Sequence, residues 1–212
     1  MKRNILICLA TTLLFTGCNS NSSEPTNANE ISYLKVGNKW IYSFTDFNPD
    51  GSIERTMIDS LEVIGTSVID GKEYFQFSKG GYQRVDEQGL WARNISNSKE
   101  ILGFKYPTSI GDRWGYDTSL IMYGQSSQDT QYLSRATLKL DTTIQTEAGT
   151  FSCIKYVEES YLKSDGTLFN RDYLFVDPKK GLVEAISYDD VDPITNKLYK
   201  SSSLHLIKLV QK

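Results

Sequence analysis

The chain has 212 residues, of which 39% are hydrophobic and 12% aromatic, and its formal charge at pH 7 is −3. This length suits a domain with a sizeable core. The mildly acidic balance argues against a nucleic-acid partner and against electrostatic docking on anionic lipids.

Residues 1–17 have the layout of a secretory signal peptide. Two basic residues precede an apolar stretch from Ile5 to Phe15, which is too short to span a bilayer as a stable helix. The residues FTGC, which end at Cys18, resemble the lipobox of bacterial lipoproteins, although leucine is usual where Phe15 stands. The resemblance implies cleavage after Gly17 and a lipid on Cys18. The alternative is an ordinary signal peptide that is cut near a cysteine by chance.

Residues 18–30 are predicted to be a flexible polar tether. The stretch NSNSSEPTNANE has no large apolar side chain, so it cannot bury enough surface to offset the entropy of ordering it. Asn19 is not the aspartate that retains lipoproteins at the inner membrane. The resemblance therefore implies an outer-membrane protein, anchored through the lipid on Cys18, on the periplasmic or the cell-surface face.

Cysteine use predicts a mature chain without an intrachain disulfide. Cys8 leaves with the signal peptide and Cys18 would be acylated, so Cys153 has no partner in the chain. The stability of the domain must then come from its core. Loss of the two basic residues at positions 2 and 3 also changes the formal charge from −3 to −5.

From Lys39 onward the pattern has the period of β-strands, interrupted by turns. The predicted strands are the runs IYSFTDF, EYFQFS, YQRVD, LWARNI, ATLKLDTTIQ, FSCIKYVEE, DYLFV and LHLIKLV. Turn pairs such as Asp70–Gly71 and Lys180–Gly181 separate them. Ile53–Ile64 also fits one face of a helix, but we predict a strand. The pattern predicts a single all-β domain over 31–212, an antiparallel meander that forms a curved sheet, a half-barrel or a sandwich.

The phrase VGNKWIYSF returns as IGDRWGYDT, 74 residues later. In each copy a glycine turn precedes a strand on which a tryptophan and a tyrosine share a face: Trp40 and Tyr42, then Trp114 and Tyr116. Two such anchors predict two related halves, 34–106 and 107–212. We expect the four rings to pack in a core, each burying on the order of 150–250 Å². The alternative is a ligand-binding groove.

Five phrases in this order resemble small uncharacterised envelope lipoproteins of the Bacteroidota. They are LKVGNKWIY, YQRVDEQGLW, SIGDRWGY, EAGTFSCIKY and YLFVDPKKGLVE, and they carry the pattern G-x-x-W-x-Y, G-D-x-W, A-G-T-F-x-C and G-L-V. The resemblance covers most of the mature chain and implies an all-β domain, but it implies no activity.

One loop has the spacing of calcium ligands. Asp46, Asn48 and Asp50 alternate before Gly51, as in the first half of an EF-hand loop. Met57 stands where that loop needs a bidentate glutamate. We therefore favour a plain hairpin turn, with calcium as the alternative and no other cofactor expected.

No hydrolase, phosphate-binding, zinc or dinucleotide motif appears in the sequence. His205 is the only histidine, and Cys153 is expected to pack as a small hydrophobic residue rather than act as a nucleophile. No catalytic residue is predicted. Carboxylate pairs such as those of glycosidases depend on spatial separation, which sequence does not give.

Three hypotheses of function follow. The first is a lipid-anchored envelope binding or interaction module without catalytic activity, whose partner is a protein or a glycan. The second is a periplasmic carrier of acyl chains or lipoproteins with an apolar half-barrel, for which Ile53–Ile64 is the candidate helical lid. The third is a hydrolase with an unrecognised carboxylate site.

Overall fold

The computed structural model describes residues 31–93, 99–119, 130–191 and 198–212. The signal peptide, the tether and Cys18 lie outside the described residues. The described part is all-β, as predicted. Its strands are β1 (Lys39–Phe47), β2 (Ile53–Ile69), β3 (Lys72–Phe77), β4 (Tyr82–Asp86), β5 (Gly89–Arg93), β6 (Glu100–Lys105), β7 (Arg113–Ser119), β8 (Thr130–Thr146), β9 (Gly149–Leu162), β10 (Leu168–Asp177), β11 (Gly181–Tyr188), β12 (Asp190–Val191), β13 (Leu198–Tyr199) and β14 (Ser202–Val210).

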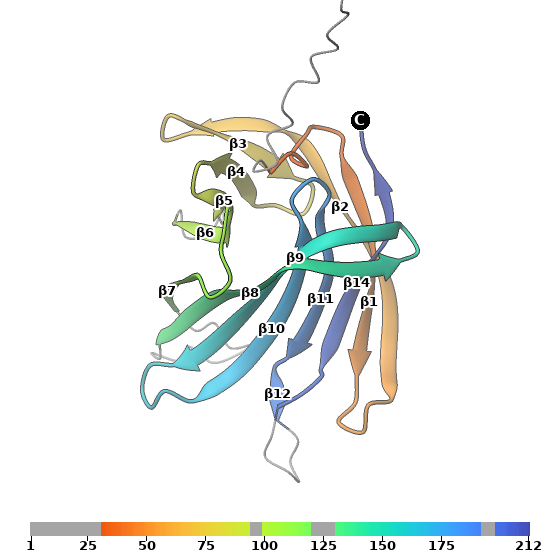
Figure 1. The fold of residues 1–212 in the computed structure, drawn as a ribbon, viewed down its shortest axis with the longest axis vertical. Helices are drawn as coiled ribbons and strands as arrows, with labels where there is room; N and C mark the ends of the chain where they lie inside the picture. Colours follow the sequence, from red (N-terminus) through yellow and green to blue (C-terminus); the bar gives the residue numbers. More distant parts are fainter. Residues whose placement is uncertain (1–30, 94–98, 120–129, 192–197) are drawn as a thin grey trace, which may run out of the picture.

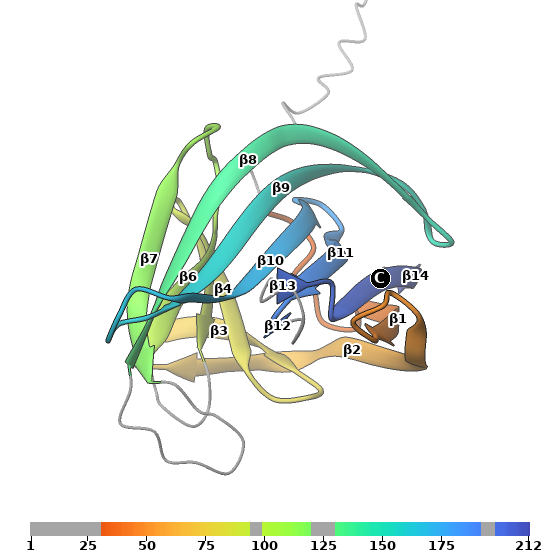
Figure 2. The same ribbon diagram turned by 90° about the horizontal axis from the view of Figure 1, so that it is seen from below.

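Twelve of these strands form one antiparallel sheet in the order β6-β5-β4-β3-β2-β1-β14-β11-β10-β9-β8-β7, and β12 pairs with β13 alone. The first and the last strands of the domain pair with each other, because β1 lies beside β14. Figures 1 and 2 show the sheet curled into a nearly closed barrel, in which the two edge strands, β6 and β7, come near each other. No helix in the described part of the chain is long and apolar enough to cross a membrane.

The predicted strands and turns appear in the structure. Ile53–Ile64 is strand throughout, as part of β2, so its fit to a helix face has no counterpart in the fold. The Asp70–Gly71 pair has positive φ at both residues, 53° and 75°, as a tight hairpin with this twist requires. Strands β6 and β11 were not among the predicted runs, because glycine or a charged residue interrupts their alternation.

The two copies of the repeated phrase begin with the same turn. Gly37 and Gly111 have φ of 90° and 88°, a conformation that glycine adopts without strain. In each copy the next residue, Asn38 or Asp112, donates its backbone N–H to the carbonyl three residues earlier at 3.0 Å. The division of the chain into related halves stays a prediction.

Trp40 and Tyr42 pack in the main core, with 2% and 6% of their surface exposed. Their polar atoms hold the turn between β10 and β11. Trp40 Nε1 donates to the carbonyl of Lys180 at 2.6 Å, and Tyr42 Oη donates to that of Leu182 at 3.0 Å. Gly181 lies between these acceptors, and a Cβ there would come within 3.1 Å of Trp40 Nε1. The first aromatic anchor therefore fixes a turn 140 residues away.

Replacing Gly181 should measure this packing. Gly181→Ala adds a Cβ against Trp40 at a residue with φ of 94°, and we expect it to lower the free energy of unfolding by about 1–3 kcal/mol. The matched control is Gly166→Ala, because Gly166 has φ of 74° but open space around the added Cβ. Urea unfolding of both variants checks the prediction, and equal losses would show that contact with Trp40 contributes nothing.

Candidate functional site

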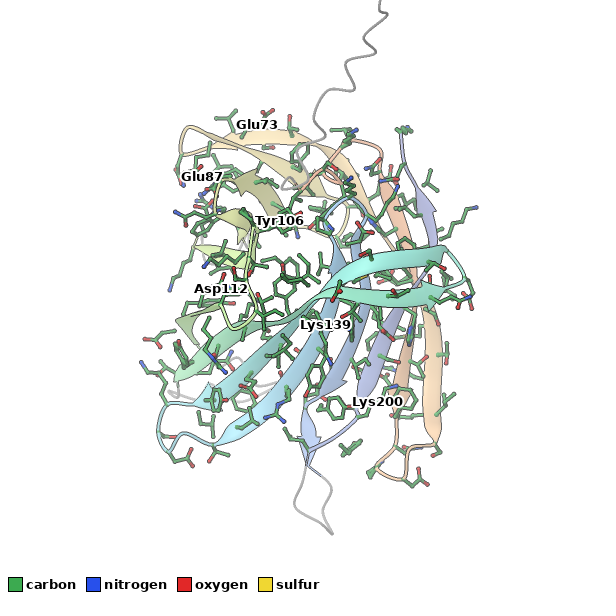
Figure 3. All side chains as sticks on the ribbon, in the orientation of Figure 1. Glu73, Glu87, Tyr106, Asp112, Lys139 and Lys200 are labelled. Atoms are coloured by element: carbon green, nitrogen blue, oxygen red, sulfur yellow. The ribbon has the colours of Figure 1, made fainter. Side chains whose placement is uncertain are left out.

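The inner face of the barrel carries a mostly apolar cavity of about 400 Å³, open to solvent beside Asp59 and Lys79 and called the inner cavity here. Cross-strand partners share a face of a sheet, so the pairing of Trp40 with Leu61 continues one aromatic and aliphatic surface from β1 to β2. The apolar side chains that line the cavity include Trp40, Tyr42, Leu61, Phe77, Phe104 and Leu204. Figure 3 shows side chains that project from the strands into the space between the ribbons of the barrel.

A second cavity, of about 570 Å³, adjoins the inner cavity and is called the mouth here. Both are lined by Leu61, Phe77, Lys79 and Gln83, so they are neighbours that share these four residues. Segments far apart in the sequence form the mouth, namely the β3–β4 turn, β5, β6 and β7. Tyr116 of the second copy lies there, whereas Trp40 and Tyr42 of the first copy line the inner cavity.

Trp114, the remaining anchor, lies at the seam between the two edge strands. Its Nε1 donates to the carbonyl of Leu102 in β6 at 3.0 Å, and Arg135 Nη1 donates to the same oxygen at 2.9 Å. Tyr156 Oη donates to the carbonyl of Lys105 at 3.0 Å. Side chains from β7, β8 and β9 thus satisfy backbone carbonyls of β6. An edge strand would otherwise expose such groups to other chains.

Weakening the seam should affect the edges of the sheet more than its centre. Trp114→Phe keeps a ring against Tyr156 but removes the indole donor, and we expect a loss of about 1 kcal/mol of stability. Hydrogen–deuterium exchange should rise in residues 100–105 and 113–117. Strand β1, which is paired on both sides, serves as the internal control. A uniform rise in all strands would contradict a local role at the seam.

A polar row crosses the inner face next to an apolar one. The apolar row consists of Phe44, Leu204, Ala185, Leu174 and Tyr156, each opposite the next in the strand register. Two residues along each strand, on the same face, lies a row of Asp46, Ser202, Ser187, Asp172, Glu158 and Arg135. Arg135 forms an ion pair with Glu158, and its guanidinium lies over the ring of Tyr116 with 5.6 Å to the centroid. Sequence reasoning missed this row, because only the register aligns its members.

Asp172 is the carboxyl group that this row perturbs most clearly. Its pKa is raised to about 6, mainly by burial and also by the nearby carboxylates of Glu158 and Asp189, while a hydrogen bond with Ser187 acts in the opposite direction. Among the described residues, no group donates a hydrogen bond to its buried Oδ1. Two carboxyl groups in different environments are the arrangement that acid–base chemistry uses, so Asp172 with Glu158 is where a hydrolytic role would first be tested.

The stability of the protein should depend on Asp172 in a direction opposite to the usual one for a carboxylate. Its folded pKa lies above its unfolded value, so the ionised form destabilises the fold at neutral pH, and this cost disappears as the pH falls from about 6 toward 4. We expect Asp172→Asn to stabilise the protein by about 1–3 kcal/mol at pH 7.5 and by almost nothing at pH 4.

Urea unfolding at several pH values measures this difference. Asp165→Asn is the matched control, because Asp165 lies in an exposed hairpin where the backbone N–H of Thr167 lowers its pKa. Its replacement should give no gain at neutral pH. A destabilised Asp172→Asn at pH 7.5 would show instead that the ionised carboxylate has a stabilising partner.

The predicted calcium loop forms the hairpin that the sequence favoured. Asp46 is ion-paired with Arg55. Asp50 Oδ1 accepts from Ser52 N at 2.9 Å and from Ser52 Oγ at 2.6 Å, and Asn48 Nδ2 donates to the same hydroxyl at 3.0 Å. In the described ranges, no group of three or more His, Cys, Asp or Glu side chains is placed to hold a metal ion. Calcium binding stays the alternative to a plain hairpin turn.

Cys153 and His205 have ordinary structural surroundings. Cys153 is completely buried in the main core, and burial raises the pKa of its thiol to about 12, so the thiolate form is disfavoured at neutral pH. His205 Nδ1 lies 3.1 Å from Glu184 Oε1, a contact between opposed residues on neighbouring strands. Each residue therefore has a structural explanation.

Comparison with known proteins gives similarity of fold only. No protein-family model and no curated protein matches the chain. A solved structure from Bacteroides fragilis, provisionally named an exported protein with a YmcC-like fold, is 14% identical, with 87% of this chain and 100% of that chain covered and a TM-score of 0.44. Another from Parabacteroides distasonis, provisionally named a lipoprotein, is 16% identical, with 86% and 99% covered and a TM-score of 0.46. Similarity this low transfers no function.

Proposed function

We propose that this protein is a lipid-anchored binding protein of the bacterial envelope, without catalytic activity, that holds an apolar ligand in its inner cavity. The cavity carries the proposal, because aromatic and aliphatic side chains from several strands line it. Its volume of about 400 Å³ is in the range of small-molecule sites. Such sites are mostly apolar, with a few polar groups that orient the ligand.

The anchoring part of the proposal rests on the sequence. The lipobox resemblance at Cys18 supports attachment to a membrane, and Asn19 supports the outer one. The polar stretch up to residue 30 supplies the reach between the lipid and the folded body. Protein and glycan partners were the first expectation from the sequence. The cavity instead favours an acyl-chain ligand, although the candidate helical lid of that hypothesis, Ile53–Ile64, is part of strand β2.

The energetics of such a ligand are simple. Each methylene group that leaves water contributes about 0.8 kcal/mol, so a chain of several methylenes provides useful affinity in a preformed site. The cost of ordering the protein is small, because Trp40 and Tyr42 are already fixed by their hydrogen bonds to the β10–β11 turn. A rigid apolar wall therefore favours the binding of a flexible alkyl chain.

Filling the cavity tests the proposal. All contacts described above lie within residues 31–212, so a chain that begins at residue 19 keeps them all and carries no lipid. Native mass spectrometry of this chain should detect co-purified acyl ligands or added fatty acid. Leu61 lines both cavities, and Leu61→Trp replaces it with a bulky indole ring that should fill part of the ligand space. We expect this variant to reduce ligand binding about tenfold or more.

The matched control lies on the same strand. Val68→Trp adds a ring at a residue with 74% of its surface exposed, and it should leave binding unchanged. Circular dichroism of both variants checks that the fold is kept. Equal binding by the two tryptophan variants, or no acyl ligand bound by the parent chain, would contradict the proposal.

A further inference from the structure

The mouth carries more positive than negative charge, although the whole chain is acidic. Three of its lining residues are cations, Lys79, Arg93 and Lys99, and Asp117 is its one carboxylate. They come from the β3–β4 turn, from β5, from the segment just before β6, and from β7. The chain as a whole has a formal charge of −3. A local excess of cations at the opening of an apolar cavity favours an anion there.

The three cations already have contacts, and among them Lys79 has the pair that is most exposed and so most open to a ligand. Lys79 is paired with Asp59, and both side chains are about half exposed, at 53%. Arg93 Nη1 lies 2.6 Å from Asp70, whose side chain is 74% exposed, but the Arg93 side chain itself is only 13% exposed. A pair exposed on both sides, as Lys79–Asp59 is, is weak and exchanges partners readily. Asp117, the one carboxylate of the mouth, is itself 2.8 Å from Lys163.

Lys79 also connects the charged and the apolar parts, because it lines the inner cavity as well as the mouth. Its apolar stem can follow the cavity wall, while its ammonium group is paired with Asp59, which lines the inner cavity. Gln83, which lines both cavities too, adds an amide donor at the same level. The hydroxyl-bearing rings of Tyr82 and Tyr116 complete the polar surroundings of the mouth. The lining therefore changes from apolar to cationic along the Lys79 side chain.

The geometry points to a ligand with one alkyl chain and one anionic head group, with the chain in the inner cavity and the head group beside Lys79 in the mouth. This inference rests on the proposed function and makes it specific. A carboxylate, as in a free fatty acid, and a phosphate monoester, as in a lipid head group, share the required chemistry. An uncharged or a cationic amphiphile with the same chain should bind less tightly.

A series of ligands with the same alkyl chain separates the head group from the chain. Isothermal titration calorimetry on the chain that begins at residue 19 would compare lauric acid, lauryl phosphate, lauryl alcohol and laurylamine, below the concentrations at which they form micelles. We expect the two anions to bind about two- to tenfold more tightly than the alcohol, and the amine to bind most weakly. The stronger of the two anions then identifies the kind of head group.

Two substitutions in one ion pair should act in opposite directions. Lys79→Gln removes a cation and should weaken the anions about two- to fivefold, with little effect on the alcohol. Asp59→Asn removes the competing carboxylate and should strengthen the anions. A purely structural role of the pair would weaken every ligand in both variants. Lys39→Gln is the control, because Lys39 has a similar exposed pair with Glu62 but lines neither cavity.

The outcomes distinguish this inference from the function on which it rests. Equal affinities for the alcohol and the anions, or identical effects of Lys79→Gln on both, would overturn the anionic head group but leave an apolar ligand. Failure of all four compounds to bind would overturn the proposed function as well. Preference for an anion, lost in Lys79→Gln and increased in Asp59→Asn, supports both.

Discussion

The fold depends on indole N–H groups that donate to backbone carbonyls of strands with which their own strand does not pair. Trp40 in β1 reaches Lys180 in the β10–β11 turn, and Trp114 in β7 reaches Leu102 in β6. Because a curved sheet with two free edges leaves backbone groups unpaired, closure needs donors that act across the gap. A tryptophan supplies such a donor on a large apolar ring, so each repeated phrase adds a long-range hydrogen bond together with core packing. The first phrase fixes the inside of the barrel and the second fixes its seam.

This closure gives the inner face two different ends. Along neighbouring strands, an apolar row from Phe44 to Tyr156 lies beside a polar row from Asp46 to Arg135, only two residues further along each strand. The apolar row leads to the inner cavity through Leu204. The polar row keeps its charges largely paired, at the cost of the buried carboxyl of Asp172. The part of the interior beside the apolar row can therefore accept an alkyl chain, whereas ion pairs of the protein occupy the part beside the polar row.

The mouth shows how tertiary structure creates local charge from an acidic chain. Lys79, Arg93 and Lys99 are separated by mostly neutral and acidic residues in the sequence, with Arg84 as the one basic residue between them, and no basic run marks them. The meander brings the β3–β4 turn next to β5 and β6, while closure adds β7 on the other side. The net charge of the chain disfavours anionic ligands, but the grouping of these three cations in the fold favours them at the mouth.

Much of the fold was predictable from the sequence. Alternating Tyr, Phe, Val and Ile gave the strands, and paired turn residues such as Asp70–Gly71 gave the hairpins, because side-chain period and positive φ are local properties. The roles of Trp40 and Trp114 were only half predictable: their face on the strand follows from spacing, but their acceptors lie 140 and 12 residues away. The inner cavity, the mouth and the Asp172 row were decided by the tertiary structure alone. Each depends on strand register and on the closure of the sheet, which are set by contacts between distant residues and leave no mark in any one stretch of sequence.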